Sequence, residues 1–193
     1  MTSRVSRYGR ASATIGLVIA PIATVLIALQ LSAPGIPPKT VRQAESIVAF
    51  ILAKAGVSVS WDGPGAYQIQ ITNSPLRGRS ADAAGFAVLT PGDSGYAAIS
   101  YPAVEQTAGS VGADPGDLLG AAIAHEAGHL LLGPAHSPFG VMRAHFRLRE
   151  IEMAGRGELL FSADQAARLR EKLRSKATSA TATSAPARAE SHQ

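Results

Sequence analysis

The sequence predicts one compact α+β domain that follows an N-terminal transmembrane helix. Three observations point to this fold class: apolar residues at helical spacing near residue 50, alternating segments between residues 57 and 103, and a long apolar helix after residue 114. The chain has 193 residues, of which 46% are hydrophobic. This length and composition suit a single domain with a buried core, and they exclude disorder of the whole chain.

The N-terminal segment has the composition of a membrane anchor. Residues 11–33 contain no charged side chain, and about 20 apolar residues are enough for a helix to cross the hydrocarbon layer. Arg4, Arg7 and Arg10 precede this run, which orients the N-terminus toward the cytoplasm. A cleaved signal peptide and a buried helix of a soluble domain are the alternatives. An anchor or a signal peptide would place the rest of the chain in the periplasm or outside the cell.

The charge distribution argues against a nucleic-acid partner. The formal net charge is +4, but residues 1–10 carry +3 and residues 168–193 carry +4. Residues 11–167 carry −3, whereas nucleic-acid binding calls for basic residues clustered on a folded face. The chain has no cysteine, which excludes disulfides, thiolate nucleophiles and cysteine-ligated zinc. No feature of the sequence predicts an oligomeric state.

The first predicted helix follows a linker that is rich in proline and glycine, at residues 34–38. Apolar residues then recur at steps of three and four from residue 41 to residue 55, and Gly56 ends the helix. Strands follow by alternation of apolar and polar residues, and a Pro-Gly-Asp turn separates the last two. The predicted strands are residues 57–61, 67–71, 86–90 and 96–103.

Two further helices are predicted from their caps. The first has Asp114 as its N-cap and Pro115 at the first helical position, and it runs to about residue 132, where Gly133 ends it. Ser162 and Gln165 form a capping box for the last helix, which runs to about residue 174. The predicted organisation is an anchor (1–33), a linker (34–38), one domain (39–175) and a disordered tail (176–193).

Four of the five histidines lie in one short window, and their spacing predicts a metal site. On a helix, His129 is rotated about 40° from His125, and Glu126 is rotated about 100° from it, so the three side chains share one arc. Two imidazoles one turn apart can bind the same Zn²⁺ ion. Glu126 then lies beside the metal, where it can accept a proton from an activated water. Gly133 permits a chain reversal that returns His136 as the third ligand.

At these residues the sequence resembles the metzincin zinc peptidases, whose pattern is HExxHxxGxxH followed by a methionine turn. The residues that match in type and order are His125, Glu126, His129, Gly133 and His136. Ser137 resembles the matrixin version of the motif, and Gly140-Val141-Met142 resembles the methionine turn. The chain is also similar to small membrane-anchored bacterial proteins that carry HExGHLLLG followed by HSxxGxM.

The resemblance implies a minimal metzincin-like domain with a mixed sheet, an active-site helix and a C-terminal helix. In that family the three histidines bind zinc, the glutamate (here Glu126) is the general base, and the methionine (here Met142) is structural. A polypeptide substrate lies along an edge strand ahead of the active-site helix, for which residues 96–103 are the candidate. The implied function is a membrane-anchored zinc endopeptidase.

The chain departs from the metzincin pattern at one point. Three residues rather than two separate His129 from Gly133, and one extra helical residue turns the exit by about 100° and advances it by about 1.5 Å. The third ligand therefore has alternatives to His136, which are His145, Glu150 and Glu152. The neighbouring basic residues are expected to be solvated or to pair with these two glutamates, and the alternative is that they meet acidic groups of a substrate or lipid; they are Arg143, Arg147 and Arg149.

Two other functions stay open. A non-catalytic zinc-binding or partner-binding module is favoured by the extra residue after His129, but a structural site does not need the carboxylate of Glu126. A three-histidine, metal-dependent ribonuclease that resembles the bacterial rRNA-maturation family is the less favoured alternative. That family lacks the glutamate after the first histidine, whereas this chain has Glu126. Proteins of that family are also cytoplasmic, whereas the N-terminal segment of this chain predicts export or membrane insertion.

Overall fold

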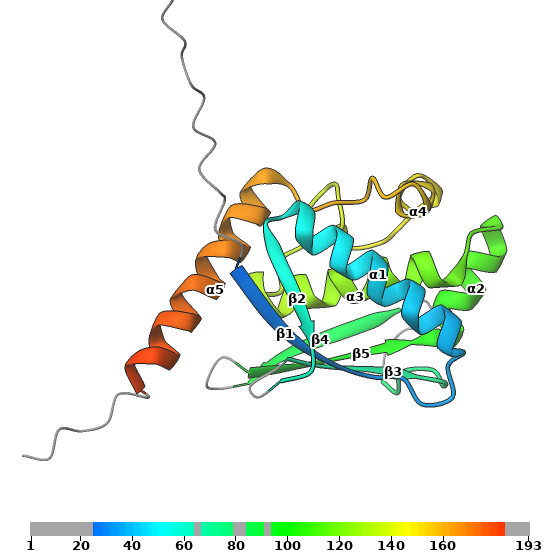
Figure 1. Ribbon diagram of the computed structural model, residues 1–193. Coiled ribbons are helices and arrows are strands. Elements are labelled where there is room, and N and C mark those ends of the chain that lie inside the picture. The colour runs from blue at the N-terminus through cyan, green and yellow to red at the C-terminus, as the bar shows by residue number, and fades with distance from the viewer. Residues whose placement is uncertain (1–24, 64–66, 79–83, 91–93, 184–193) are drawn as a thin grey trace, which may run out of the picture.

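The computed structural model describes residues 25–63, 67–78, 84–90 and 94–183. These residues form an α+β fold with one mixed five-stranded sheet and five helices, which confirms the predicted class (Figure 1). The strands are β1 (Val25–Ser32), β2 (Val57–Trp61), β3 (Tyr67–Thr72), β4 (Gly85–Thr90) and β5 (Ser94–Ser100). The helices are α1 (Pro38–Lys54), α2 (Tyr101–Val111), α3 (Pro115–Leu132), α4 (Leu148–Gly155) and α5 (Ala163–Thr183).

The strands lie in the order β2-β1-β3-β5-β4. The first four are parallel, whereas β4 runs antiparallel to β5 because only residues 91–93 connect the two strands. The prediction of an edge strand at residues 96–103 is therefore wrong. β5 lies between β3 and β4, and β4 forms the edge of the described sheet.

The last third of the apolar N-terminal run is a strand, not part of a membrane helix. The helix predicted for residues 11–33 would include Val25–Ser32, but this segment is β1, which pairs with β2 on one side and β3 on the other. A continuous apolar run suits a strand in a parallel sheet as well as a helix. Residues 1–24 lie outside the described residues. Within the described part of the chain, no helix is long and apolar enough to cross a membrane.

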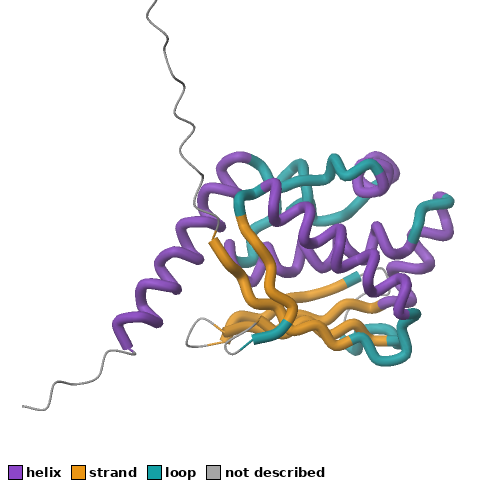
Figure 2. Tube along the Cα trace, viewed as in Figure 1, coloured by secondary structure: helices purple, strands orange, loops and turns teal. Residues whose placement is uncertain are grey.

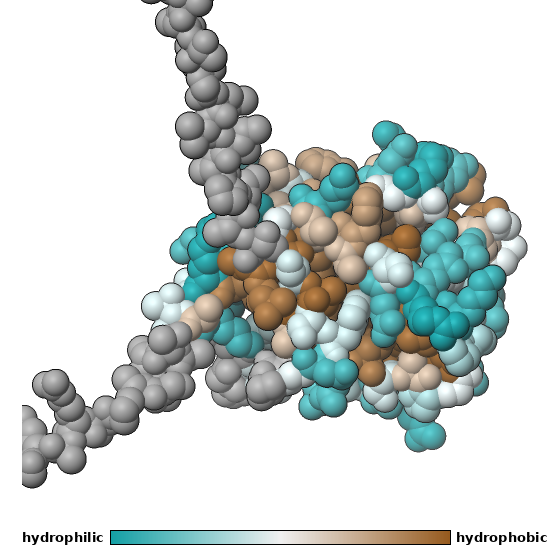
Figure 3. Space-filling view, in the orientation of Figure 1, coloured by the Kyte–Doolittle hydropathy of each residue, from teal (hydrophilic) through white to brown (hydrophobic). Residues whose placement is uncertain are grey.

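The core lies between one face of the sheet and the helices α1 and α3 (Figure 2). The two helices approach closely at Gly120, where a Cβ atom would lie 2.6 Å from the Cβ of Ile47. Strand residues alternate between this core and the opposite face, which is why β3 buries Ile69 and exposes Gln68. Figure 3 shows apolar surface over the β1–β2 end of the molecule, where Leu26 is 63% exposed.

Helix α2 is not among the predicted elements, and α5 is longer than predicted. Residues 101–103 begin α2 instead of ending a strand, because the Ser100 hydroxyl accepts a hydrogen bond from the backbone N–H of Ala103 and caps the helix. The capping box of Ser162 and Gln165 is confirmed by two reciprocal hydrogen bonds of 2.9 and 3.2 Å. The helix it starts, α5, continues to Thr183 and so covers part of the predicted disordered tail; it extends away from the sheet (Figure 1).

Candidate metal centre

Helix α3 carries two of the three predicted ligands, and its ends follow from local sequence signals. The Asp114 carboxylate accepts a hydrogen bond of 2.7 Å from the backbone N–H of Gly116, as expected of an N-cap. The helix ends at Gly133, whose φ of 90° lies in the region that favours glycine. The predicted helix is thus confirmed, and it places His125 and His129 one turn apart on the face that meets the loop after Gly133.

The side chains of His125, His129 and His136 come together as a group that could hold a metal ion. The Nε2 atom of His129 lies 3.0 Å from Nε2 of His125 and 3.2 Å from Nε2 of His136. Nitrogen ligands of a tetrahedral zinc ion, at bonds of about 2.0–2.1 Å, are about 3.4 Å apart. The spacing of the three nitrogens therefore fits one shared ion.

Backbone carbonyls orient two of the three imidazoles. Nδ1–H of His125 donates to the carbonyl of Val141 at 2.7 Å, and Nδ1–H of His129 donates to the carbonyl of Gly133 at 3.0 Å. These bonds leave the Nε2 lone pairs facing one another, an arrangement that a cation between them stabilises. The chemistry of the donor set therefore also fits a metal.

The alternative third ligands do not join this group. His145 is exposed and lines the same cavity. The Glu150 carboxylate is buried and lies 2.8 Å from the guanidinium of Arg143, which confirms the predicted ion pair for this one of the three arginines. Glu152 lies 3.9 Å from Arg156 instead. His136 reaches the other two histidines in spite of the extra residue before Gly133.

The methionine of the predicted turn packs against α3 between the two histidines. Met142 is buried, and a Cβ atom at Gly128 would overlap its sulfur atom. Glycine at this position lets the loop approach the helix closely. The same loop supplies the Val141 carbonyl that orients His125, and it is held in turn by a hydrogen bond from the Val141 N–H to Leu160. The loop thus packs against α3 beside the histidines and fixes the orientation of the His125 ring.

A cavity of about 920 Å³ opens beside the histidines, and Glu126 lines it. The Glu126 side chain is almost fully buried, with 5% of the residue exposed. The walls of the cavity come from α3, the edge strand β4 and the loop at residues 143–146. Much of the lining is apolar, including Phe86, Val88 and Phe146. The structure therefore places the predicted carboxylate and the three predicted ligands beside the same open cavity.

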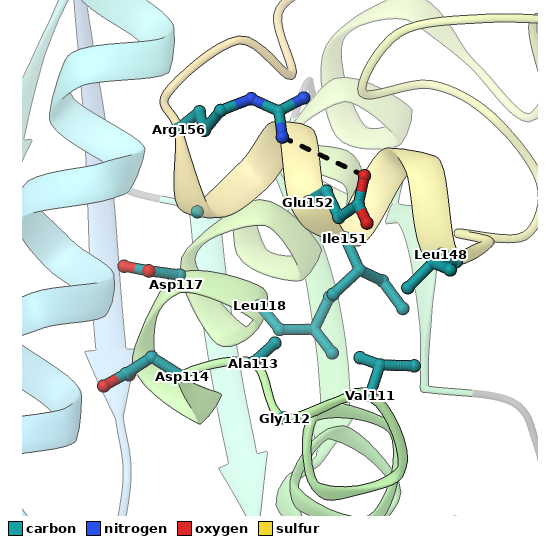
Figure 4. A pocket seen from close by; sticks show the side chains of 11 residues that line it. Val111, Gly112, Ala113, Asp114, Asp117, Leu118, Leu148, Ile151, Glu152 and Arg156 are labelled. Carbon is teal, nitrogen blue, oxygen red and sulfur yellow. Dashed lines mark ion pairs between the residues drawn. The ribbon is translucent and has the colours of Figure 1, made fainter.

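A second, smaller cavity of about 310 Å³ lies on the other side of Leu118 (Figure 4). It is formed by the end of α2, the start of α3 and α4, and the ion pair between Glu152 and Arg156 lies beside it. Of the described residues that line this cavity, only Leu118 also lines the cavity at the histidines. The three histidines do not line the second cavity, so it is separate from the candidate metal centre.

Burial lowers the pKa of His125 to about 4. The hydrogen bond to Val141 opposes this shift, and the neighbouring His129 and His136 add to it. Burial is also the main cause of a lowered pKa at His136. Both imidazoles are therefore neutral at neutral pH, which is the form that binds metal.

The metal-free protein is expected to lose stability as the pH falls from about 6.5 toward 4. In the unfolded chain His125 takes up a proton near its ordinary pKa of 6.5, whereas in the folded protein it does so only near 4. The unfolded state binds more protons in this window, which lowers the free energy of unfolding by about 3 kcal/mol. Urea unfolding at pH 7, 5.5 and 4, without metal, measures the change. His125→Asn should flatten this dependence, and an unchanged dependence in the variant would contradict the assignment.

The chain matches no protein-family model, and no curated protein is similar to it in sequence.

Proposed function

We propose that this protein is a zinc-dependent endopeptidase with a minimal metzincin-like domain. The observation that carries the proposal is the group formed by His125, His129 and His136, with the Glu126 carboxylate in the same cavity. A purely structural metal site has no use for a buried carboxylate at this place. The combination supports hydrolysis more than it supports metal storage or a structural role.

The three histidines would hold the zinc ion, and Glu126 would act as the general base. Zinc with three protein ligands keeps an open position, and when bound it acts as a Lewis acid toward water and a carbonyl group. The Glu126 carboxylate accepts the proton of the water whose oxygen attacks the peptide carbon. It then gives that proton to the amine that leaves when the C–N bond breaks. The carbonyls of Val141 and Gly133 keep His125 and His129 in the ligating orientation.

A polypeptide is the substrate that best suits this cavity, because an edge strand forms one of its walls. Strand β4 pairs with β5 on one side, and within the described part of the chain its other edge has no partner strand. The unpaired N–H and C=O groups of an edge strand can bind an extended peptide as an added strand. Because β4 also forms a wall of the histidine cavity, a peptide bound there would pass beside Glu126. β4 thus takes the role that the sequence assigned to residues 96–103.

The N-terminal charge pattern supports export from the cytoplasm. Three arginines precede an uncharged run, and the part of that run ahead of β1 comprises residues 11–24. This stretch of about 14 residues has the length of a signal-peptide apolar region, whereas a membrane-spanning helix needs about 20. We therefore favour a cleaved segment over an anchor. The mass of the protein recovered from its native host distinguishes the two, because an uncleaved N-terminus would favour the anchor.

The proposed function is tested by metal analysis and a peptide library on the purified full chain. We expect about one equivalent of zinc and cleavage within peptides that is lost on chelation and restored by added zinc. Protein without bound metal would contradict the site itself. A zinc-loaded protein that cleaves no peptide would support the non-catalytic module instead, and one that cleaves RNA would support the ribonuclease.

A further inference from the structure

The start of β4 approaches the Glu126 side chain so closely that a side chain at position 85 would require the Glu126 carboxylate to shift. A Cβ atom built on Gly85 would lie 2.5 Å from Oε1 and 3.0 Å from Cδ of Glu126. The next nearest atom is the carbonyl oxygen of Ala98, at 3.1 Å. We propose that Gly85 is a positioning residue, which leaves a recess for the Glu126 carboxylate and so sets its place relative to the three histidines. This inference rests on the proposed hydrolytic function.

The backbone at Gly85 is held in place from one side. In the antiparallel ladder Gly85 lies opposite Ile99, and the next residue lies opposite Ala98. The backbone N–H of Ser100 donates to the carbonyl of Ala84 at 2.8 Å, directly before the strand. Ala98 and Ile99 are both buried in the sheet. The strand therefore has little freedom to retreat from a group added at position 85.

The backbone of Glu126 is equally constrained. The residue lies in the second half of the 18-residue helix α3, and the helix is buried against α1 and the sheet. The torsions of the Glu126 side chain are therefore the part of this contact that can change. If a methyl group filled the recess, the carboxylate would be displaced while the two backbones stayed in place.

The displacement is large enough to affect the reaction. Carbon and oxygen atoms in ordinary contact are separated by about 3.5 Å, so the carboxylate oxygen would have to move by about 1 Å. A misplacement of about 1 Å costs on the order of 100-fold in rate when it affects a group that takes part in the chemistry. The three nearest atoms to the added methyl belong to Glu126 and Ala98, not to a histidine, so zinc binding is expected to persist.

The first test compares Gly85→Ala with Gly109→Ala in the full chain. Gly109 lies in α2 with no atom within 4 Å of the position of an added Cβ, so it is a matched glycine-to-alanine control. We expect kcat to fall about 100-fold in Gly85→Ala, with wild-type KM and zinc content, and to stay unchanged in Gly109→Ala. Wild-type kcat in Gly85→Ala would overturn the role of Gly85 and would leave the proposed function in place.

A double-mutant cycle identifies the group that the methyl displaces. Aspartate at position 126 is one methylene shorter, so its carboxylate lies farther from residue 85. We expect Glu126→Asp to cost at least 10-fold less activity in the Gly85→Ala background than in the wild type. Additive losses would overturn the proposal, because a merely structural effect of the methyl would not depend on the length of this side chain.

A stability measurement tests the contact even if the protein cleaves no peptide. We expect Gly85→Ala to lower the melting temperature more in the wild type than in Glu126→Ala, which lacks the carboxylate. Equal shifts in the two backgrounds would overturn the proposed contact. Absence of peptide cleavage by the wild type would count against the proposed function alone, so the two failures are distinguishable.

Discussion

Replacement of Glu126 by glutamine should lower kcat for peptide hydrolysis by about 10³-fold and leave the zinc content unchanged. Glutamine keeps the size of the side chain and a polar end, but its amide cannot accept a proton as a carboxylate does. General acid–base catalysis contributes about 10²–10⁴-fold to the rate of an enzyme. The group that could hold the ion consists of three histidines and does not include Glu126, so metal binding has no need of this carboxylate.

The comparison needs a control for the loss of one negative charge. Glu105 is an exposed carboxylate on α2, and Glu105→Gln should have wild-type activity. The measurement is kcat and KM on a fluorogenic peptide cleaved by the wild type, with zinc determined on the same samples. Equal activity of Glu126→Gln and the wild type would rule out the general-base mechanism, even if the peptide is cleaved.

The second large effect concerns the third ligand. His136→Ala should weaken zinc binding by about 10³-fold. The binding free energy of zinc at a site with four protein ligands is about 10–16 kcal/mol, so each ligand contributes about 3–4 kcal/mol, and one ligand is lost here. The Nε2 atom of His136 lies 3.2 Å from that of His129, so its removal opens one side of the group. Competition with a chromophoric chelator measures the affinity.

His145→Ala is the matched control for this prediction. His145 is the same type of residue in the lining of the same cavity, but it lies outside the group of three histidines. Its replacement should leave the zinc affinity within about twofold of the wild type, because no nitrogen that contacts the ion is lost. If His145→Ala weakened zinc binding and His136→Ala did not, the ligand set inferred from the structure would be wrong.

Elements with strong local signals could be predicted from the sequence. The bounds of α3 follow from Asp114 and Gly133, and the start of α5 follows from the capping box of Ser162 and Gln165. Strands β2 and β3 follow from alternation over five or six residues. Each of these signals depends on hydrogen bonds and side-chain directions within a few residues, so no knowledge of the rest of the fold is required.

Elements whose environment is set by distant segments could not be predicted from the sequence. The residues of β1 are as apolar as a membrane helix, and only their pairing with β2 and β3 makes them a strand. The exchange of edge position between β4 and β5 has the same cause, because strand order depends on which segments pair and not on the composition of either strand. Helix α2 was missed although its cap, Ser100, is a local signal. The alternation of residues 96–100 was extended to residue 103, so the first residues of the helix were assigned to a strand.

For the candidate site, the sequence by itself determined the residue types and the relative placement of the side chains on α3. Helical spacing places His125, Glu126 and His129 on one arc, whatever surrounds the helix. Only the tertiary structure decided that His136 joins them while Glu150 pairs with Arg143, and that Gly85 lies against Glu126. The physical reason is distance along the chain: a helix fixes neighbours within one turn, whereas contacts across longer separations depend on the path of the loops and on strand pairing.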